Sequence, residues 1–225
     1  MAYFRCIVYS ALLAGLLTGG IHTGIQYVST LPYVMQAELY EQSHPQHKVH
    51  AAHINAAALQ GQVPAGRMTA TTVANILMSI GFALLLTTLC SYQKRLNYAH
   101  GLAWGLAGFA VFFLAPTWVN APSLPGAAEE VDLYVRQMWW FAAASVTALG
   151  LAAAYYFKQP AWRISGLLLL FAFVCLTPRY AAHYEIAVLS KLAQQFFWAS
   201  LVSNAAFWLL LGLSVSYFLP RFMRG

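Results

Sequence analysis

Six long apolar runs, separated by more polar segments, occupy most of this chain. An α-helix needs about 20 predominantly apolar residues to cross the hydrocarbon core of a bilayer, and most of the runs reach that length. Inside a bilayer the backbone N–H and C=O groups have no water to bond, and a helix satisfies them within one segment. The pattern therefore predicts an all-α, polytopic membrane protein in which residues 1–225 form a single transmembrane domain. The predicted helices are 6–28, 71–92, 98–118, 138–157, 162–178 and 196–219.

The first and the fifth runs are the least regular of these segments. The first follows Arg5 and so resembles a secretory signal peptide, but its apolar stretch is too long and does not end in an A-x-A site. We therefore expect an uncleaved helix. The fifth run loses its apolar character at Pro178 and Arg179, which predicts a short helix that ends there.

Composition also indicates a membrane location. Of the 225 residues, 60% are hydrophobic and 8% are charged, whereas a soluble domain is about 25% charged. Most of the outer surface must therefore face lipid. The net charge of +6 comes from basic residues scattered through short loops, so it indicates no nucleic-acid partner.

The positions of lysine and arginine predict the orientation of the helices, because these residues are enriched on the cytoplasmic side. A six-helix arrangement with both termini in the cytoplasm places the larger basic group inside and leaves the polar segment 29–70 outside. The inner group is Arg5, Lys94, Arg95, Lys158, Arg163, Arg221 and Arg224, and the outer group is Lys48, Arg67, Arg136, Arg179 and Lys191.

Carboxylate and imidazole side chains are concentrated in the extracytoplasmic segment 29–70. Such oxygen and nitrogen donors favour Co²⁺, Ni²⁺ or Zn²⁺ over the ions that thiolates select. The three cysteines lie apart, inside or at the ends of apolar runs, and indicate neither a disulfide framework nor a thiolate site. The predicted metal ligands recur at intervals of three residues and are Glu38, Glu41, His44, His47, His50 and His53.

The spacing decides which of these side chains share a site. Three residues along an α-helix correspond to a rotation of about 300°, so neighbouring pairs such as His47 and His50 share a face. Pro45 disfavours helix at His44, which we expect in an extended approach. Binding should weaken below about pH 6, because protonated imidazole does not ligate a metal. The alternative is a solvated polar loop whose histidines bind nothing tightly.

His22 is the histidine that lies clearly within an apolar run. An ionisable residue is costly inside a bilayer, so it suggests a functional role. Thr18, His22 and Gln26 recur at four-residue intervals and form one polar stripe on the first predicted helix. This stripe could line an ion path, with His22 as a metal ligand. It could equally hold a neutral histidine that a neighbouring helix satisfies, with Gly15 and Gly19 allowing close packing.

Polar residues near the other predicted helices have simpler explanations. Asp132 complements the dipole at the start of the fourth helix, and Arg136 pairs with it or anchors the helix at the headgroups. His183 could add a ligand at the outer face. Hydrogen bonds between helices, rather than metal binding, are expected for Asn75, Ser79, Ser203 and Asn204.

The sequence favours transport over catalysis. It contains no P-loop, nucleophile elbow, HExxH motif or dinucleotide fingerprint, so we expect no enzyme activity, no resident cofactor and no ATP hydrolysis in this chain. A haem or quinone oxidoreductase subunit would need two axial histidines that face each other within the bilayer. Only His22 lies clearly within an apolar run, and His100 lies at the edge of one, so the sequence does not favour this alternative. A metal sensor or scaffold without transport is the other alternative, which the sequence does not separate from a permease.

Several short motifs together resemble one known family. They are Trp104-Gly-Leu-Ala-Gly-Phe-Ala, Leu114-Ala-Pro116, Leu124-Pro-Gly126, Asp132-Leu133, Arg136-Gln-x-Trp-Trp140 and Ala37-Glu-Leu-Tyr-Glu41, with a late segment from Phe196 to Gly212. In these motifs, and over most of its length, the chain resembles the CbtA family of cobalt transporters.

The resemblance implies a bacterial cobalt uptake permease of the inner membrane, linked to cobalamin synthesis. It also implies a small partner subunit with a single span and histidines of its own. Co²⁺ would then be the transported ion, with Glu38 and Glu41 in a family motif near the outer end of the first helix. The family is expected to have about five spans, whereas the charge pattern favours six, because five would move Arg221 and Arg224 outside.

Overall fold

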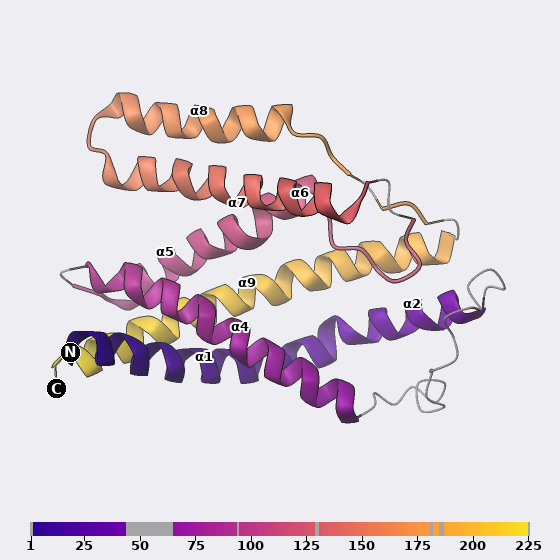
Figure 1. The fold of residues 1–225 in the computed structure, drawn as a ribbon, viewed down its shortest axis with the longest axis horizontal. Coiled ribbons are helices and arrows are strands. Elements are labelled where there is room, and N and C mark those ends of the chain that lie inside the picture. Colours follow the sequence, from indigo (N-terminus) through magenta and orange to yellow (C-terminus); the bar gives the residue numbers. More distant parts are fainter. Residues whose placement is uncertain are drawn as a thin grey trace.

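The computed structural model describes residues 2–43, 65–93, 95–128, 131–180, 182–184 and 187–224. Their regular structure is helical (Figure 1) and includes five long, apolar helical segments, which confirms the prediction of an all-α, polytopic membrane protein. The helices are α1 (Ala2–Ser29), α2 (Leu31–Ser43), α4 (Ala65–Ser91), α5 (Tyr98–Phe109), the π-helical η3 (Ala110–Leu114), α6 (Ala115–Val119), α7 (Leu133–Tyr156), α8 (Pro160–Leu176) and α9 (Ala187–Arg224).

In the described parts of the chain, five helical segments are long and apolar enough to cross a membrane. α8 is also apolar, but its 17 residues give about 25 Å of helix, slightly less than the roughly 30 Å of a hydrocarbon core. Its Trp162, Leu168 and Phe171 side chains are exposed, as on a surface that faces lipid. The five longer segments are Tyr3–Ser29, Ala65–Ser91, Tyr98–Val119, Leu133–Tyr156 and Ala187–Met223.

α1 packs against both α4 and α9, and these three helices form the main bundle (Figure 1). α1 approaches α4 closely at two glycines. A Cβ on Gly15 would lie 2.6 Å from the Cα of Ile80, and one on Gly19 would lie 2.8 Å from the Cα of Ile76. Small residues permit such an approach in membrane proteins, where helices associate through tight packing rather than through the hydrophobic effect. The close packing expected at these glycines is therefore present.

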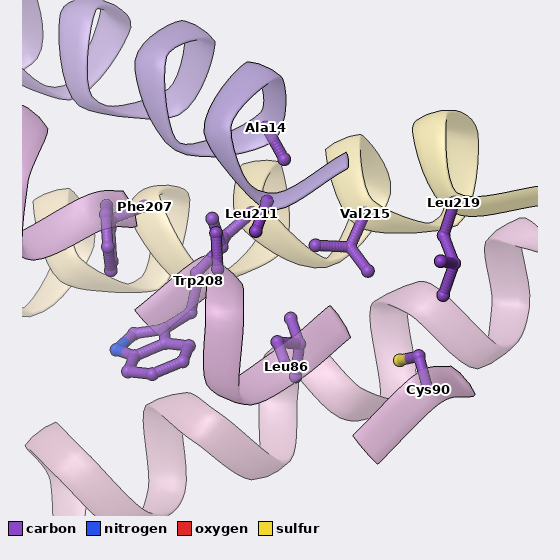
Figure 2. Packing of buried hydrophobic residues seen from close by; sticks show 10 residues of the cluster. Ala14, Leu86, Cys90, Phe207, Trp208, Leu211, Val215 and Leu219 are labelled. Atoms are coloured by element: carbon purple, nitrogen blue, oxygen red, sulfur yellow. The ribbon is translucent and has the colours of Figure 1, made fainter. Parts of the chain in front are cut away.

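The buried core of this bundle combines side chains of α1, α4 and α9. Figure 2 shows Leu211 and Val215 of α9 with Ala14 of α1 on one side and Leu86 of α4 on the other. Leu211, Val215 and Ala14 are fully buried. Because this core continues along the middle of the three helices, it determines which faces of α1 and α9 meet.

Both chain ends lie at one end of the bundle, termed here the terminal end, and α2 lies with the start of α9 at the opposite, far end (Figure 1). Contacts between the first and last helices produce this arrangement. The Cys6 thiol donates to the Phe222 carbonyl oxygen (3.1 Å), and the rings of Tyr9 and Phe222 lie 6.3 Å apart. α7 and α8 pack as an antiparallel hairpin whose turn also lies at the terminal end (Figure 1).

A second, smaller core lies at the far end and joins α2 to the first turns of α9. Ala37 of α2 is buried in a cluster with Leu189 and Leu192 of α9, and Leu124 from the segment after α6 completes it. α9 has 38 residues, or about 57 Å of helix, so it extends well beyond the thickness of a hydrocarbon core. Its first turns therefore pack on α2 instead of facing lipid.

Candidate functional site

A partly polar cavity of about 280 Å³ lies between α1, α2, α4 and α9 in the far half of the bundle. Arg67, at the start of α4, is its exposed lining residue, and Ser203 of α9 is its most buried one. The cavity thus leads from the surface toward the interior. Its lining residues with amide, hydroxyl or guanidinium groups include Thr23, Gln26, Thr30, Arg67, Thr71, Ser200, Ser203 and Asn204.

An amide network joins α4 to α1 beside this cavity. The Nδ2 group of Asn75 donates to Gln26 Oε1 (2.7 Å) and to Thr23 Oγ1 (3.1 Å). The Nε2 group of Gln26 then faces His22 Nε2 at 3.0 Å. Because an amide nitrogen only donates, His22 Nε2 is the acceptor, and the imidazole in this arrangement is neutral.

His22 lies one turn below Gln26 on α1 and is 7% exposed. Its ring packs against Phe207 of α9, with 4.9 Å between the ring centroids. Within the described residues, His22 Nδ1 is buried without a hydrogen-bond partner, and so is Ser203 Oγ. Unpaired buried polar atoms are costly unless water, an ion or a ligand satisfies them. Two such atoms therefore occur at and near the cavity.

The polar stripe predicted on the first helix faces the interior of the bundle. Thr18 is fully buried, and its Oγ1 atom donates to Ser214 Oγ of α9 (3.4 Å). Gln26 lines the cavity at the other end of the stripe. Thr18, His22 and Gln26 therefore form a line of polar side chains that leads from the cavity into the core. Within this line, Gln26 satisfies one ring nitrogen of His22.

Glu38 of α2 lies beside the cavity rim, where it forms a bidentate ion pair with Arg67 of α4. The Arg67 Nη1 and Nη2 groups donate to Glu38 Oε2 (2.8 Å) and Oε1 (2.7 Å). The side chains of Arg67 and Glu38 are 41% and 27% exposed, so solvent reaches the pair. A guanidinium therefore occupies both carboxylate oxygens of one predicted metal ligand. No local spacing in the sequence marks this pair, because the partners are 29 positions apart.

The remaining predicted ligands of segment 29–70 fall at or beyond the end of α2. Glu41 belongs to α2, but its side chain lies outside the described part of the chain, as do the four histidines His44, His47, His50 and His53. Among the residues that are described, no group of three or more His, Cys, Asp or Glu side chains could hold a metal ion. Metal binding by this segment stays a prediction.

Asp132, Arg136 and His183 are not among the residues that line the cavity. Asp132 is the N-cap of α7, and its carboxylate accepts a hydrogen bond from the Leu133 N–H (2.9 Å). Arg136 lies in the first turn of the same helix. His183 exchanges two backbone hydrogen bonds with Ala128 (2.9 and 3.1 Å), which join the segments that follow α6 and α8. Asp132 thus has the helix-end role, and His183 helps to connect two loops.

Of the residues expected to bond between helices, Asn75 does so, whereas Asn204 donates to Ser200 O within α9 (2.9 Å). Ser200, Ser203 and Asn204 form the α9 wall of the cavity. Sequence reasoning missed this wall, although spacings of three and four place such residues on one helix face. It also missed the position of Arg67 at the rim.

Comparison with known proteins identifies one family. The family described as probable cobalt transporter subunit (CbtA) matches residues 4–220, nearly the whole chain. No curated protein and no solved structure matches the chain. The resemblance seen in the short motifs therefore extends across all the helices that form the cavity.

Proposed function

Because the chain belongs to the family of probable cobalt transporter subunits (CbtA), we propose that it provides the route by which Co²⁺ enters through the bacterial inner membrane. The observation that carries the proposal is the partly polar cavity, which leads from a solvent-exposed rim to buried oxygen and nitrogen atoms. Neutral donors of this kind suit a borderline divalent ion that must bind and leave again. The imported ion would supply cobalamin synthesis.

In the proposed route the ion exchanges some of its water for protein atoms at the cavity. Thr23, Gln26 and Ser203 supply neutral oxygen donors in the wall. His22 is next, since it lies one turn deeper and its neutral ring keeps a lone pair on Nε2, toward Gln26. Thr18 follows one turn further. Polar groups thus succeed one another at single-turn intervals along α1.

The arrangement of the chain ends supports six crossings. The Cys6 thiol contacts the Phe222 carbonyl oxygen, so the start of α1 and the end of α9 lie at the same end of the bundle, an arrangement that fits an even number of spans. The five long segments alone would leave the ends on opposite faces. α8 supplies the sixth crossing, because it packs on α7 and runs antiparallel to it (Figure 1). Basic residues near the chain ends, such as Arg5 and Arg221, favour a cytoplasmic terminal end, with the cavity on the outer side.

The polar segment between α2 and α4 would collect ions before they reach the cavity. Glu41 and the predicted ligands His44, His47, His50 and His53 would raise the local concentration of Co²⁺, and Ni²⁺ or Zn²⁺ could compete for the same donors. The family is one of transporter subunits, which fits a second membrane component. We propose a small single-span partner with histidines of its own.

The membrane potential is a sufficient energy source for this route. The inward pull on a divalent cation is about 4.6 kcal/mol per 100 mV, twice the value for a unit charge. That free energy corresponds to roughly three decades of accumulation. The family contains transporter subunits rather than enzymes, and a potential-driven path needs no nucleotide chemistry in this chain.

Cobalt uptake in a strain that lacks this chain tests the proposal. Expression of the wild-type chain with its partner should restore uptake. Ser203→Leu places a bulky apolar side chain in the cavity and should reduce uptake per molecule about tenfold, equivalent to about 1.4 kcal/mol of added barrier. Ser190→Leu is the matched control, because Ser190 is an exposed residue of the same helix away from the cavity. Cobalt binding without any chain-dependent uptake would instead indicate a sensor or scaffold.

A further inference from the structure

The ion pair at the cavity rim has a geometry that bears on ion entry. Arg67 holds both oxygens of Glu38 through two hydrogen bonds, of 2.7 and 2.8 Å, the bidentate form that a guanidinium makes with a carboxylate. Of the acidic side chains that the structure describes, Glu38 and Asp132, Glu38 is the one paired with a cavity residue. A divalent cation that uses this carboxylate must therefore displace the guanidinium.

The position of Arg67 makes such a displacement feasible. Its side chain is 41% exposed, so a released guanidinium can turn to water. Exposed ion pairs are weak, because water and salt screen them. Arg67 also lines the cavity, where an unpaired guanidinium would repel an entering cation, and the contact with Glu38 cancels that charge. The same contact thus neutralises the rim and keeps the carboxylate occupied.

We propose that Arg67 sets the affinity of the entry site for its ion: it is a tethered cation that occupies Glu38 until a hydrated divalent cation replaces it. The cation then gains a carboxylate ligand at the rim, and the guanidinium moves into solvent. The inference rests on the proposed function, which supplies the cation, but its test does not depend on transport.

A purely structural role of the pair leads to a different expectation. The pair joins α2 to the start of α4, close to the Tyr27 hydroxyl, which donates to the Met68 carbonyl oxygen (3.1 Å). If the pair only tethered the two helices, loss of either charge would loosen the same contact, and both changes would act in the same direction. If Arg67 competes with the ion, the two changes act in opposite directions.

Cobalt titration of the purified full-length protein in detergent separates the two cases. Arg67→Gln removes the competitor and should lower the half-saturating Co²⁺ concentration by up to about fivefold, the upper end of the range expected for an exposed ion pair. Glu38→Gln should raise that concentration, and the double variant should behave as Glu38→Gln does. Arg67→Lys, which keeps the charge but not two parallel bonds, should fall between wild type and Arg67→Gln. A His47→Ala/His50→Ala background limits binding elsewhere.

Arg179→Gln is the matched control for loss of one positive charge. Arg179 follows α8 at the far end, stacks on the Trp118 ring at 4.1 Å, and does not line the cavity. An equal gain in affinity from Arg179→Gln would show that the tighter binding in Arg67→Gln comes from the loss of one positive charge in general, and it would overturn the inference. Weaker binding in both Arg67→Gln and Glu38→Gln would show a tether and also overturn it. Tighter binding in Arg67→Gln, with no cobalt import by the wild-type chain, would support the inference while the proposed function fails.

Discussion

At the residue scale, His22 shows how a buried imidazole can be held neutral without a charged neighbour. Asn75 orients the amide of Gln26, and that amide presents an N–H to the ring. The ring nitrogen that accepts this bond also carries the lone pair that a metal ion would use. In the proposed route, an ion that binds this nitrogen would displace a single neutral hydrogen bond, a much smaller barrier than a buried ion pair would present.

Replacement of His22 by alanine should lower the maximal rate of cobalt uptake at least about tenfold at saturating cobalt, since loss of even a side chain that supports a metal ligand typically costs about 10- to 100-fold. The half-saturating concentration should change less, because the proposed capture step involves the histidines of segment 29–70 instead of His22. Uptake has to be normalised to the amount of protein in the membrane. His100→Ala is the control, as His100 is an exposed residue at the start of α5. Wild-type turnover in His22→Ala would leave His22 as a packing residue.

The histidines of segment 29–70 should affect capture rather than turnover. His47→Ala/His50→Ala should raise the half-saturating cobalt concentration and leave the maximal rate nearly intact. Wild-type affinity should fall below about pH 6, because protonated imidazole cannot ligate, and the double variant should lose much of that pH dependence. Uptake and binding curves between pH 5 and pH 8 provide the measurement. Identical curves for both proteins would contradict metal capture by these residues.

At the scale of the elements, helices in this protein approach one another closely at glycine residues. α5 packs on α9 through Gly101 and Gly105, whose Cβ positions would collide with Gly212 O and Trp208 O of α9. The Trp208 ring also stacks on Phe112 of η3, with the planes 8° apart. These contacts position α9, and through it the Ser203 wall of the cavity.

The glycine contacts lead to a paired stability test. Gly105→Ala should destabilise the protein by about 1–3 kcal/mol, the usual cost of overpacking, because the new methyl group meets the Trp208 carbonyl oxygen. Gly20→Ala should not destabilise the protein and should stabilise it by up to about 1 kcal/mol, since nothing lies within 4 Å of a Cβ at that position and alanine is the better helix former. Thermal unfolding in detergent compares the two. Equal melting temperatures would show that α5 and α9 do not approach this closely.

At the scale of the whole molecule, two regions meet around α9. The main bundle occupies the middle and the terminal end, and the smaller core at the far end joins α2 to the start of α9. The cavity lies where these regions meet, between the end of α1 and the first half of α9. A cavity at this junction can open to solvent without exposing the apolar core below it.

Reporter fusions test the six-span arrangement. A reporter fused after Gly225, and one inserted after Gln159 in the turn between α7 and α8, should both be active in the cytoplasm, because the end of α9 and this turn lie at the terminal end (Figure 1). A reporter inserted after Gly126 should be active outside. Activity outside for the Gly225 fusion, together with cytoplasmic activity at Gln159, would mean that α8 does not cross the membrane.

Features that depend on local composition were predictable, and features that depend on distant contacts were not. Apolar runs of spanning length mark α1, α4 and α7. α2 and the first turns of α9 have mixed composition and so belong to no predicted span. They pack against each other at the far end, where Ala37 and Leu189 lie in one buried cluster. From the sequence, Arg67 is predicted only to influence membrane orientation, because its partner Glu38 lies 29 positions away and no local pattern joins the two.

The sequence by itself determined the all-α membrane fold, the resemblance to the CbtA family and the polar stripe of Thr18, His22 and Gln26. Hydropathy and four-residue spacing are properties of one helix, so they can be read without knowledge of its neighbours. The tertiary structure alone decided that this stripe meets Asn75 and Ser214, that a cavity opens beside it, and that Arg67 holds Glu38. Those contacts depend on the rotation of each helix and on how closely its neighbours approach, which side-chain packing between separate helices determines.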